Sequence, residues 1–126
     1  MTITQPGRKR ILYVEDHQDT GELVATLLCD HEVVVVGNKA EGQMRATLER
    51  FDLYIFDYNL PDGTGIELCL FIRTYDHQTP IVLCTASTSL TELQVTAAGA
   101  QYFIKKGPLF IDCLVEAVSQ SFSAAA

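Results

Sequence analysis

The sequence predicts an α/β protein with a five-stranded parallel sheet and helices on both faces. Short apolar runs alternate with helix-like apolar spacing in five strand–helix units, and strict alternation of this kind is typical of parallel sheets with both faces covered. The length of 126 residues fits one domain. The hydrophobic content of 48% is that of a globular protein rather than a disordered chain. We therefore expect a single domain over residues 1–126, with its core at about 10–122.

The first two units occupy the N-terminal part of the chain. Residues 11–14 form an apolar run that predicts a buried strand. Asp19, with an acid three residues later, has the pattern of a helix N-cap. Residues 33–36 are a β-branched run and predict the second strand, and the apolar spacing over 40–51 indicates the second helix. On this spacing we expect Met44 in the core.

The third unit carries the residues that we consider most informative. Residues 53–56 predict a buried strand that ends at Asp57. The turn-forming residues of 59–65 predict a loop. The apolar stretch 66–75 predicts the third helix.

The last two units follow the same order. Residues 81–84 predict the fourth strand, and Ser89 opens a capping-box pattern for a helix that ends at Gly99. Residues 102–104 predict the fifth strand. Gly107, followed by proline, suits the N-cap of the fifth helix.

Right-handed crossovers limit the topologies open to five such units. The flavodoxin-like strand order 2-1-3-4-5 makes a three-layer sandwich in which the first and third strands are neighbours. Ligands of such folds bind outside the carboxyl ends of the strands at this point.

Acidic residues follow two of these neighbouring strands. Glu15 and Asp16 end the first strand, and Asp57 ends the third. Two like charges 4 Å apart repel by about 4 kcal/mol at an effective dielectric constant near 20. The cluster therefore requires a proton or a cation, and oxygen ligands favour Mg²⁺ or Mn²⁺ over zinc.

The same edge receives a hydroxyl and a cation. Thr85 ends the fourth strand, and Lys105 and Lys106 end the fifth. Asp57 could act as a nucleophile that forms an acyl phosphate, with lysine and hydroxyl donors on the phosphoryl oxygens. Such a transfer depends mainly on positioning and charge neutralisation.

These segments resemble a receiver domain of a two-component response regulator over about residues 10–122. The resemblance covers the first strand with its two acids, the loop after Asp57, and the segment 99–106. It implies that Asp57 accepts a phosphoryl group from a histidine kinase or phosphotransfer protein. The implied site residues are Glu15 (through water), Asp16, Asp57 and the Asn59 backbone carbonyl for Mg²⁺; Thr85, Ala86 and Lys106 for the phosphoryl group; and Thr85 and Phe103 for the switch.

The chain departs from this family in one segment. Gly107 separates the lysines from the proline that usually follows the lysine directly. Neighbouring strand residues point to opposite faces, so only Lys105 or Lys106 can reach the pocket. Counting from Gly99 selects Lys106.

The resemblance also sets expectations for partners. Phosphorylation would change the face made by the fourth helix, fifth strand and fifth helix, which would contact a downstream protein or output domain, or a second copy. Such a protein is not an enzyme beyond its own phosphoryl uptake and slow autodephosphorylation. Two alternatives remain: a pseudo-receiver that works without phosphorylation, and a haloacid-dehalogenase-like phosphohydrolase, against which Asn59 counts because such enzymes have an aspartate there.

Composition limits other functions. The net charge is −7 with nine Lys and Arg residues, which argues against direct binding of nucleic acid. Apolar runs are shorter than the ~18 residues of a membrane span, and no secretory signal is visible. The four cysteines stand among apolar neighbours without metal-site spacing, so we expect reduced, mostly core residues in a cytoplasmic protein.

Overall fold

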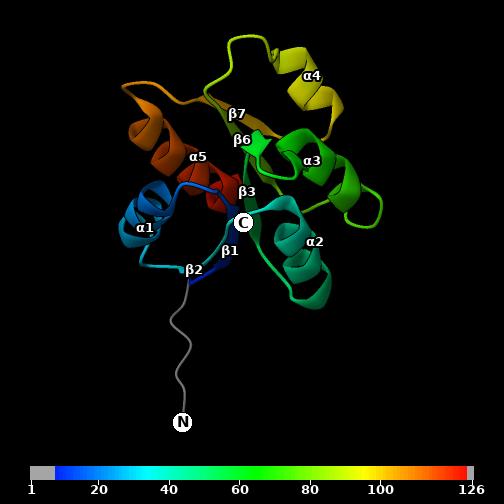
Figure 1. Ribbon diagram of the computed structural model, residues 1–126. Helices are drawn as coiled ribbons and strands as arrows, with labels where there is room; N and C mark the ends of the chain where they lie inside the picture. Colours follow the sequence, from blue (N-terminus) through cyan, green and yellow to red (C-terminus); the bar gives the residue numbers. More distant parts are fainter. Residues whose placement is uncertain (1–7, 125–126) are drawn as a thin grey trace.

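The computed structural model describes residues 8–124 and has the predicted architecture. The five strands of the main sheet alternate with five helices along the chain (Figure 1). Their bounds are β1 (Arg10–Val14), α1 (Gln18–Leu27), β2 (Glu32–Val36), α2 (Lys39–Leu48), β3 (Leu53–Asp57), β4 (Asn59–Leu60), β5 (Gly63–Thr64), α3 (Gly65–Arg73), β6 (Ile81–Thr85), α4 (Glu92–Ala97), β7 (Tyr102–Lys105) and α5 (Phe110–Ala124).

The main sheet has five strands in the order β2-β1-β3-β6-β7, and every neighbouring pair is parallel. This is the predicted order 2-1-3-4-5. The expected loop after Asp57 contains a two-stranded antiparallel hairpin, β4–β5. Val14 of β1 lies opposite Phe56 of β3, which brings the ends of these strands together at one edge.

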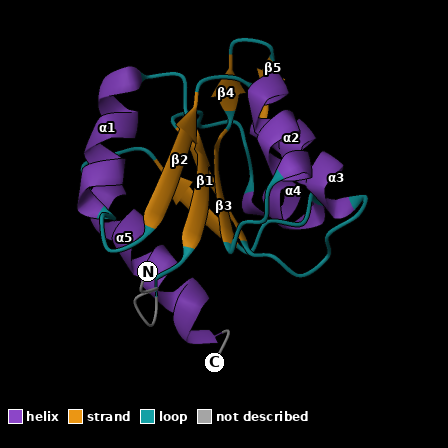
Figure 2. Ribbon diagram, turned by 90° about the horizontal axis from the view of Figure 1, so that it is seen from below, coloured by secondary structure: helices purple, strands orange, loops and turns teal. Residues whose placement is uncertain are grey.

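Helices cover both faces of the sheet. α1 and α5 lie on one side, and α2, α3 and α4 lie on the other (Figures 1 and 2). A hydrophobic core lies on each face of the sheet, and alternate residues of a strand belong to different cores. Leu12 packs in the core under α2, α3 and α4, and Tyr13 packs in the core under α1 and α5. All of β1 from Ile11 to Val14 is fully buried, which explains its unbroken apolar run. Within the described residues, no helix is long and apolar enough to cross a membrane.

Three predicted helix starts are wrong by a few residues. α1 begins at Gln18, before Asp19, and its N-cap His17 makes no side-chain capping bond. The capping box of α4 uses Thr91 and Gln94 instead of Ser89. α5 begins at Phe110, whose N–H donates to the Gly107 carbonyl. Capping residues are common in this sequence, so the local pattern alone does not select the one that is used.

Two burial predictions also need correction. Met44 is 53% exposed, because α2 turns its small residues Gly42 and Ala46 toward the sheet. Of the four free cysteines, Cys69 and Cys84 are buried, whereas Cys29 and Cys113 are exposed. Small side chains at the contact let α2 approach β1 closely: a Cβ atom at Gly42 would lie 2.9 Å from a methyl group of Val14.

The amino-terminal edge of the sheet is held by Arg10. Its guanidinium forms ion pairs with Glu32 and Glu49, donates to the Arg50 carbonyl, and lies 4.7 Å from the centre of the Phe51 ring. Glu49 also pairs with Arg45. We name this group the Arg10 network (Arg10, Glu32, Arg45, Glu49). The network joins the start of β1 to β2 and to the end of α2.

Candidate functional site

A pocket of about 360 Å³ lies at the carboxyl ends of β1 and β3. The residues that line it are Asp16, His17, Thr20, Asp57, Asn59, Ala86 and Lys106. They come from the segments after β1, β3, β6 and β7, which are far apart in the sequence. The pocket is therefore where the sequence placed its candidate site.

Three carboxylates meet at this pocket. One oxygen atom of each of Glu15, Asp16 and Asp57 lies within 4.8 Å of the other two. Asp16 is exposed, whereas Glu15 is 2% exposed and Asp57 is 5% exposed. Burial weakens the screening of their mutual repulsion by water. The group strongly favours binding of a cation.

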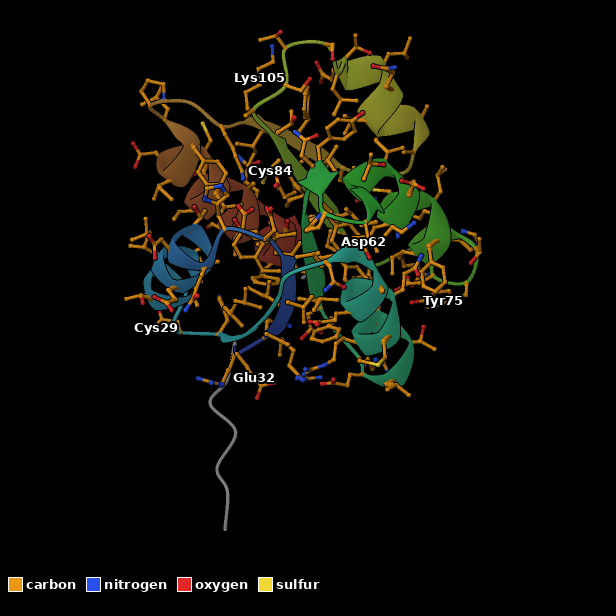
Figure 3. All side chains as sticks on the ribbon, in the orientation of Figure 1. Cys29, Glu32, Asp62, Tyr75, Cys84 and Lys105 are labelled. Carbon is orange, nitrogen blue, oxygen red and sulfur yellow. The ribbon has the colours of Figure 1, made fainter. Side chains whose placement is uncertain are left out.

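Lys106 supplies one positive charge. Its Nζ atom lies 2.6 Å from Glu15 Oε1 and 3.1 Å from Asp57 Oδ1. The Lys106 backbone N–H donates to the Thr85 carbonyl, which fixes the chain at this point. Lys105 is exposed, lies at the periphery of the molecule (Figure 3) and does not line the pocket. Of the two lysines, the structure thus places Lys106 in the pocket.

The carboxylates respond differently to this environment. Burial and the charge of Glu15 raise the pKa of Asp57 to about 6, although Lys106 opposes the shift. Burial also disfavours ionisation of Glu15, but the hydrogen bond and charge of Lys106 outweigh it and lower the pKa of Glu15. The pKa of Lys106 is raised because the two acids outweigh the effect of its burial.

The carboxylates also fit a hard divalent cation. Three carboxylate groups with a single lysine leave an excess of two negative charges when all are ionised. Mg²⁺ is bound in proteins by one or two carboxylates while it retains several waters. The oxygen donors and the room in the pocket are typical of such a site.

The loop after Asp57 is fixed from both ends. Tyr58 N–H donates to the Cys84 carbonyl, and Gly65 N–H donates to the Tyr58 carbonyl. A Cβ atom at Gly65 would lie 2.5 Å from the Asp57 carbonyl oxygen, so only glycine fits there. At the hairpin, Asp62 accepts from the backbone N–H groups at the start of α2, which anchors the segment that carries Asn59.

Three predicted residues, Glu15, Thr85 and Phe103, lie outside the pocket lining, although one oxygen of Glu15 belongs to the carboxylate cluster. Thr85 is fully buried, and its Oγ1 atom accepts from the Ser87 N–H at 2.9 Å, which leaves its own proton free to donate. Phe103 is half-buried against the α2–α3–α4 core and lines a groove between β7 and α5. Within residues 8–124 no peptide bond is cis.

Besides His17 and Thr20, which line the pocket, the buried residue Tyr13 is absent from the predicted site. The hydroxyl of Tyr13 lies 3.2 Å from Glu15 Oε1, the oxygen that Lys106 also contacts. Tyr13 is fully buried beneath the pocket. Tyr13 could have been predicted from the sequence, because it stands two residues before Glu15. In an extended chain, side chains two residues apart lie on the same face.

Comparison with known proteins gives one consistent family. A model of the response regulator receiver domain matches residues 11–119. The response regulator protein PilR of Pseudomonas aeruginosa is 35% identical over 103 residues, which cover 79% of this chain. The chain spans only 23% of the length of PilR.

Solved structures agree with this result. The receiver domain of a Francisella response regulator has a TM-score of 0.85 at 20% identity, covers 94% of this chain and 100% of its own, and shows the common fold. The response regulator TrrA of Thermotoga maritima, solved with Mg²⁺ and BeF, has a TM-score of 0.80 at 29% identity. That match covers 90% of this chain and 98% of TrrA.

Proposed function

The chain belongs to the family of response regulator receiver domains, which are phosphoacceptors and not classical enzymes, and we propose that Asp57 is its phosphoacceptor. The observation that carries the proposal is the position of the Asp57 carboxylate. It lies within 4.8 Å of two other acids and 3.1 Å from the Lys106 ammonium, at a pocket open to a donor. Asp57 is the residue that combines this charge environment with a place at the end of the central strand.

Glu15, Asp16, Asp57 and the Asn59 backbone carbonyl would hold Mg²⁺ or Mn²⁺, with Glu15 acting through water. The bound ion would neutralise the repulsion between the carboxylates and the incoming phosphoryl group. The Lys106 ammonium contacts both Glu15 and Asp57, and it would move from these acids to a phosphoryl oxygen. The close packing of Gly65 on the Asp57 backbone supports a fixed position for the nucleophile.

An Asp57 oxygen attacks the phosphorus atom of the donor. The bond from phosphorus to the donor atom breaks, the donor keeps the electron pair, and an aspartyl phosphate forms. Thr85, Ala86 and Lys106 would bind the phosphoryl oxygens. For Thr85 this requires a movement, because its side chain is fully buried and lies outside the pocket lining.

The phosphorylated state would signal through Thr85 and Phe103. Movement of Thr85 frees space toward which the half-buried Phe103 turns, and this changes the face formed by α4, β7 and α5. A partner that prefers this state shifts the population toward it. The family implies a histidine kinase as the phosphoryl donor, and a phosphotransfer protein is the alternative donor. The changed α4–β7–α5 face would bind a downstream protein, an output domain or a second copy of the chain. We propose that these interactions take place in the cytoplasm.

The test is intact-mass spectrometry after incubation with acetyl phosphate and Mg²⁺. We expect the wild-type protein to gain one phosphoryl group, which hydroxylamine removes as it does other acyl phosphates. The Asp57→Asn variant should gain none. Asp52→Asn is the matched control, since Asp52 is exposed and lies at the opposite edge of the sheet.

Each other outcome identifies an alternative. Phosphoryl uptake by the Asp57→Asn variant would place the acceptor elsewhere. Absence of uptake and of Mg²⁺ binding in the wild type would support a pseudo-receiver. Continuous turnover of a phosphate ester would favour a phosphohydrolase.

A further inference from the structure

Tyr13 carries a buried hydroxyl whose use the proposed function leaves open. The side chain is fully buried on the α1–α5 side of the sheet, in an otherwise apolar strand. Its hydroxyl donates to Glu15 Oε1 at 3.2 Å. A phenol carries one O–H group and a carboxylate only accepts, so Tyr13 is the donor in this contact.

Lys106 and Tyr13 share one acceptor atom. Glu15 Oε1 receives the Lys106 ammonium at 2.6 Å and the Tyr13 hydroxyl at 3.2 Å. The other oxygen, Oε2, has a long contact of 3.5 Å with the His17 backbone N–H. In the unphosphorylated protein Lys106 is thus the main partner of a carboxylate that is only 2% exposed.

Phosphorylation would change this arrangement. If Lys106 turns to a phosphoryl oxygen, as the proposed function requires, Oε1 of Glu15 loses its closest donor. A buried carboxylate without a donor is costly, because it has also lost its hydration. The hydroxyl of Tyr13 already contacts the same atom from a fully buried position on β1, so it needs no rearrangement to replace the ammonium.

We propose that Tyr13 is a positioning residue of the phosphorylation site: its hydroxyl holds Glu15 in place when Lys106 leaves it for the phosphoryl group. The proposal rests on the proposed function. It concerns the phosphorylated state more than the resting one, because in the resting state Lys106 satisfies the same oxygen. Removal of the hydroxyl should therefore weaken binding of a phosphoryl group or its analogue, and should affect the resting protein less.

The test compares two buried tyrosines. Tyr13→Phe removes the hydroxyl at the pocket, and Tyr54→Phe removes one from β3 on the opposite face of the sheet. Tyr54 is 2% exposed and contacts Tyr75 instead of the acidic pocket. Binding of beryllium fluoride is measured by calorimetry at saturating Mg²⁺, and melting temperatures are measured without either ion.

We expect Tyr13→Phe to bind beryllium fluoride about tenfold more weakly than wild type, which is the usual effect of a lost hydrogen bond to a charged group. Tyr54→Phe should stay within about twofold of wild type, since its hydroxyl makes no contact with the pocket. The melting temperatures of the two variants should fall by similar amounts. Equal binding losses in the two variants, or no loss in Tyr13→Phe, would overturn the proposal.

A spectroscopic measurement on the wild type covers the case in which the variant does not fold. With ¹³Cζ-labelled tyrosine, the Tyr13 resonance should shift when Mg²⁺ and beryllium fluoride are added together, and the Tyr54 resonance should not. An unchanged Tyr13 resonance contradicts the proposal. Failure of the proposed function is a separate result: the wild type would then not bind beryllium fluoride, or Asp57→Asn would bind it equally well.

Discussion

The amino ends and the carboxyl ends of the strands each carry a cluster of cations and carboxylates, but the two clusters balance charge differently. In the Arg10 network, two arginines meet two glutamates, and the guanidinium of Arg10 also has a backbone acceptor and an aromatic ring. At the pocket, one lysine faces three acids. The charges of the Arg10 network cancel, whereas the pocket has more negative than positive groups.

The difference shows how a charged cluster can be assigned to structure or to function. Side chains of the Arg10 network are about one-third exposed or more, apart from Glu49 at 28%, so water and salt screen them. The side chain of Glu15 at the pocket has no exposed surface. A buried excess of one charge sign is costly to the folded state, and a bound cation can recover that cost. Buried imbalance therefore marks a functional site better than the number of charges does.

The largest expected effect comes from removing the single cation of the pocket. Lys106→Ala leaves Glu15 buried without a counter-charge, and we expect a loss of about 3 kcal/mol in the free energy of unfolding. Urea denaturation without divalent ions measures it, and saturating Mg²⁺ should recover part of the loss. Lys105→Ala is the matched control, because that side chain is exposed, and it should change stability by less than about 0.5 kcal/mol. Equal effects of the two substitutions would contradict the assignment of Lys106.

An intermediate effect is expected from pH. The pKa of Asp57 is raised from 3.8 to about 6, so the folded state holds its proton more tightly than the unfolded chain does. The stability that this proton confers is complete below pH 3.8 and is lost as pH rises through about 6.

We expect the wild type to lose on the order of 2 kcal/mol relative to Asp57→Asn between pH 4 and pH 7. The lowered pKa of Glu15 acts in the opposite direction: its contribution is present above its ordinary value of 4.5 and is lost as pH falls. Unfolding free energies in EDTA, measured across this range for both proteins, check the prediction. Parallel curves for the two proteins would show that Asp57 has an ordinary pKa.

The smallest effect is expected at the balanced edge. Arg10→Ala removes two ion pairs and the contact with Phe51, and we expect a loss of about 1 kcal/mol that shrinks in 1 M salt. Mg²⁺ affinity should not change, because the network lies at the opposite end of β1. The loss at Lys106, in contrast, should persist in salt. A salt-independent loss at Arg10 would mean that the two edges are more alike than we infer.

The sequence by itself predicted the strand order and most of the pocket. Alternating apolar patterns specified the parallel sheet, and in a parallel sheet the carboxyl ends of strands share an edge. This is why Glu15, Asp16 and Asp57 could be placed together from their positions alone. Glu15 and Asp16 directly follow the apolar run 11–14, and Asp57 directly follows the apolar run 53–56. Their order along the chain was therefore enough to predict that they meet.

Only the tertiary structure decided the finer points. Counting from Gly99 selected Lys106, but the contacts of its ammonium group with both Glu15 and Asp57 appear only in the tertiary structure. The exposure of Met44 depends on how closely α2 packs on β1, and the role of Tyr13 depends on which atom its hydroxyl meets. These outcomes are set by distances between segments remote in sequence, and a local pattern carries no information about such distances.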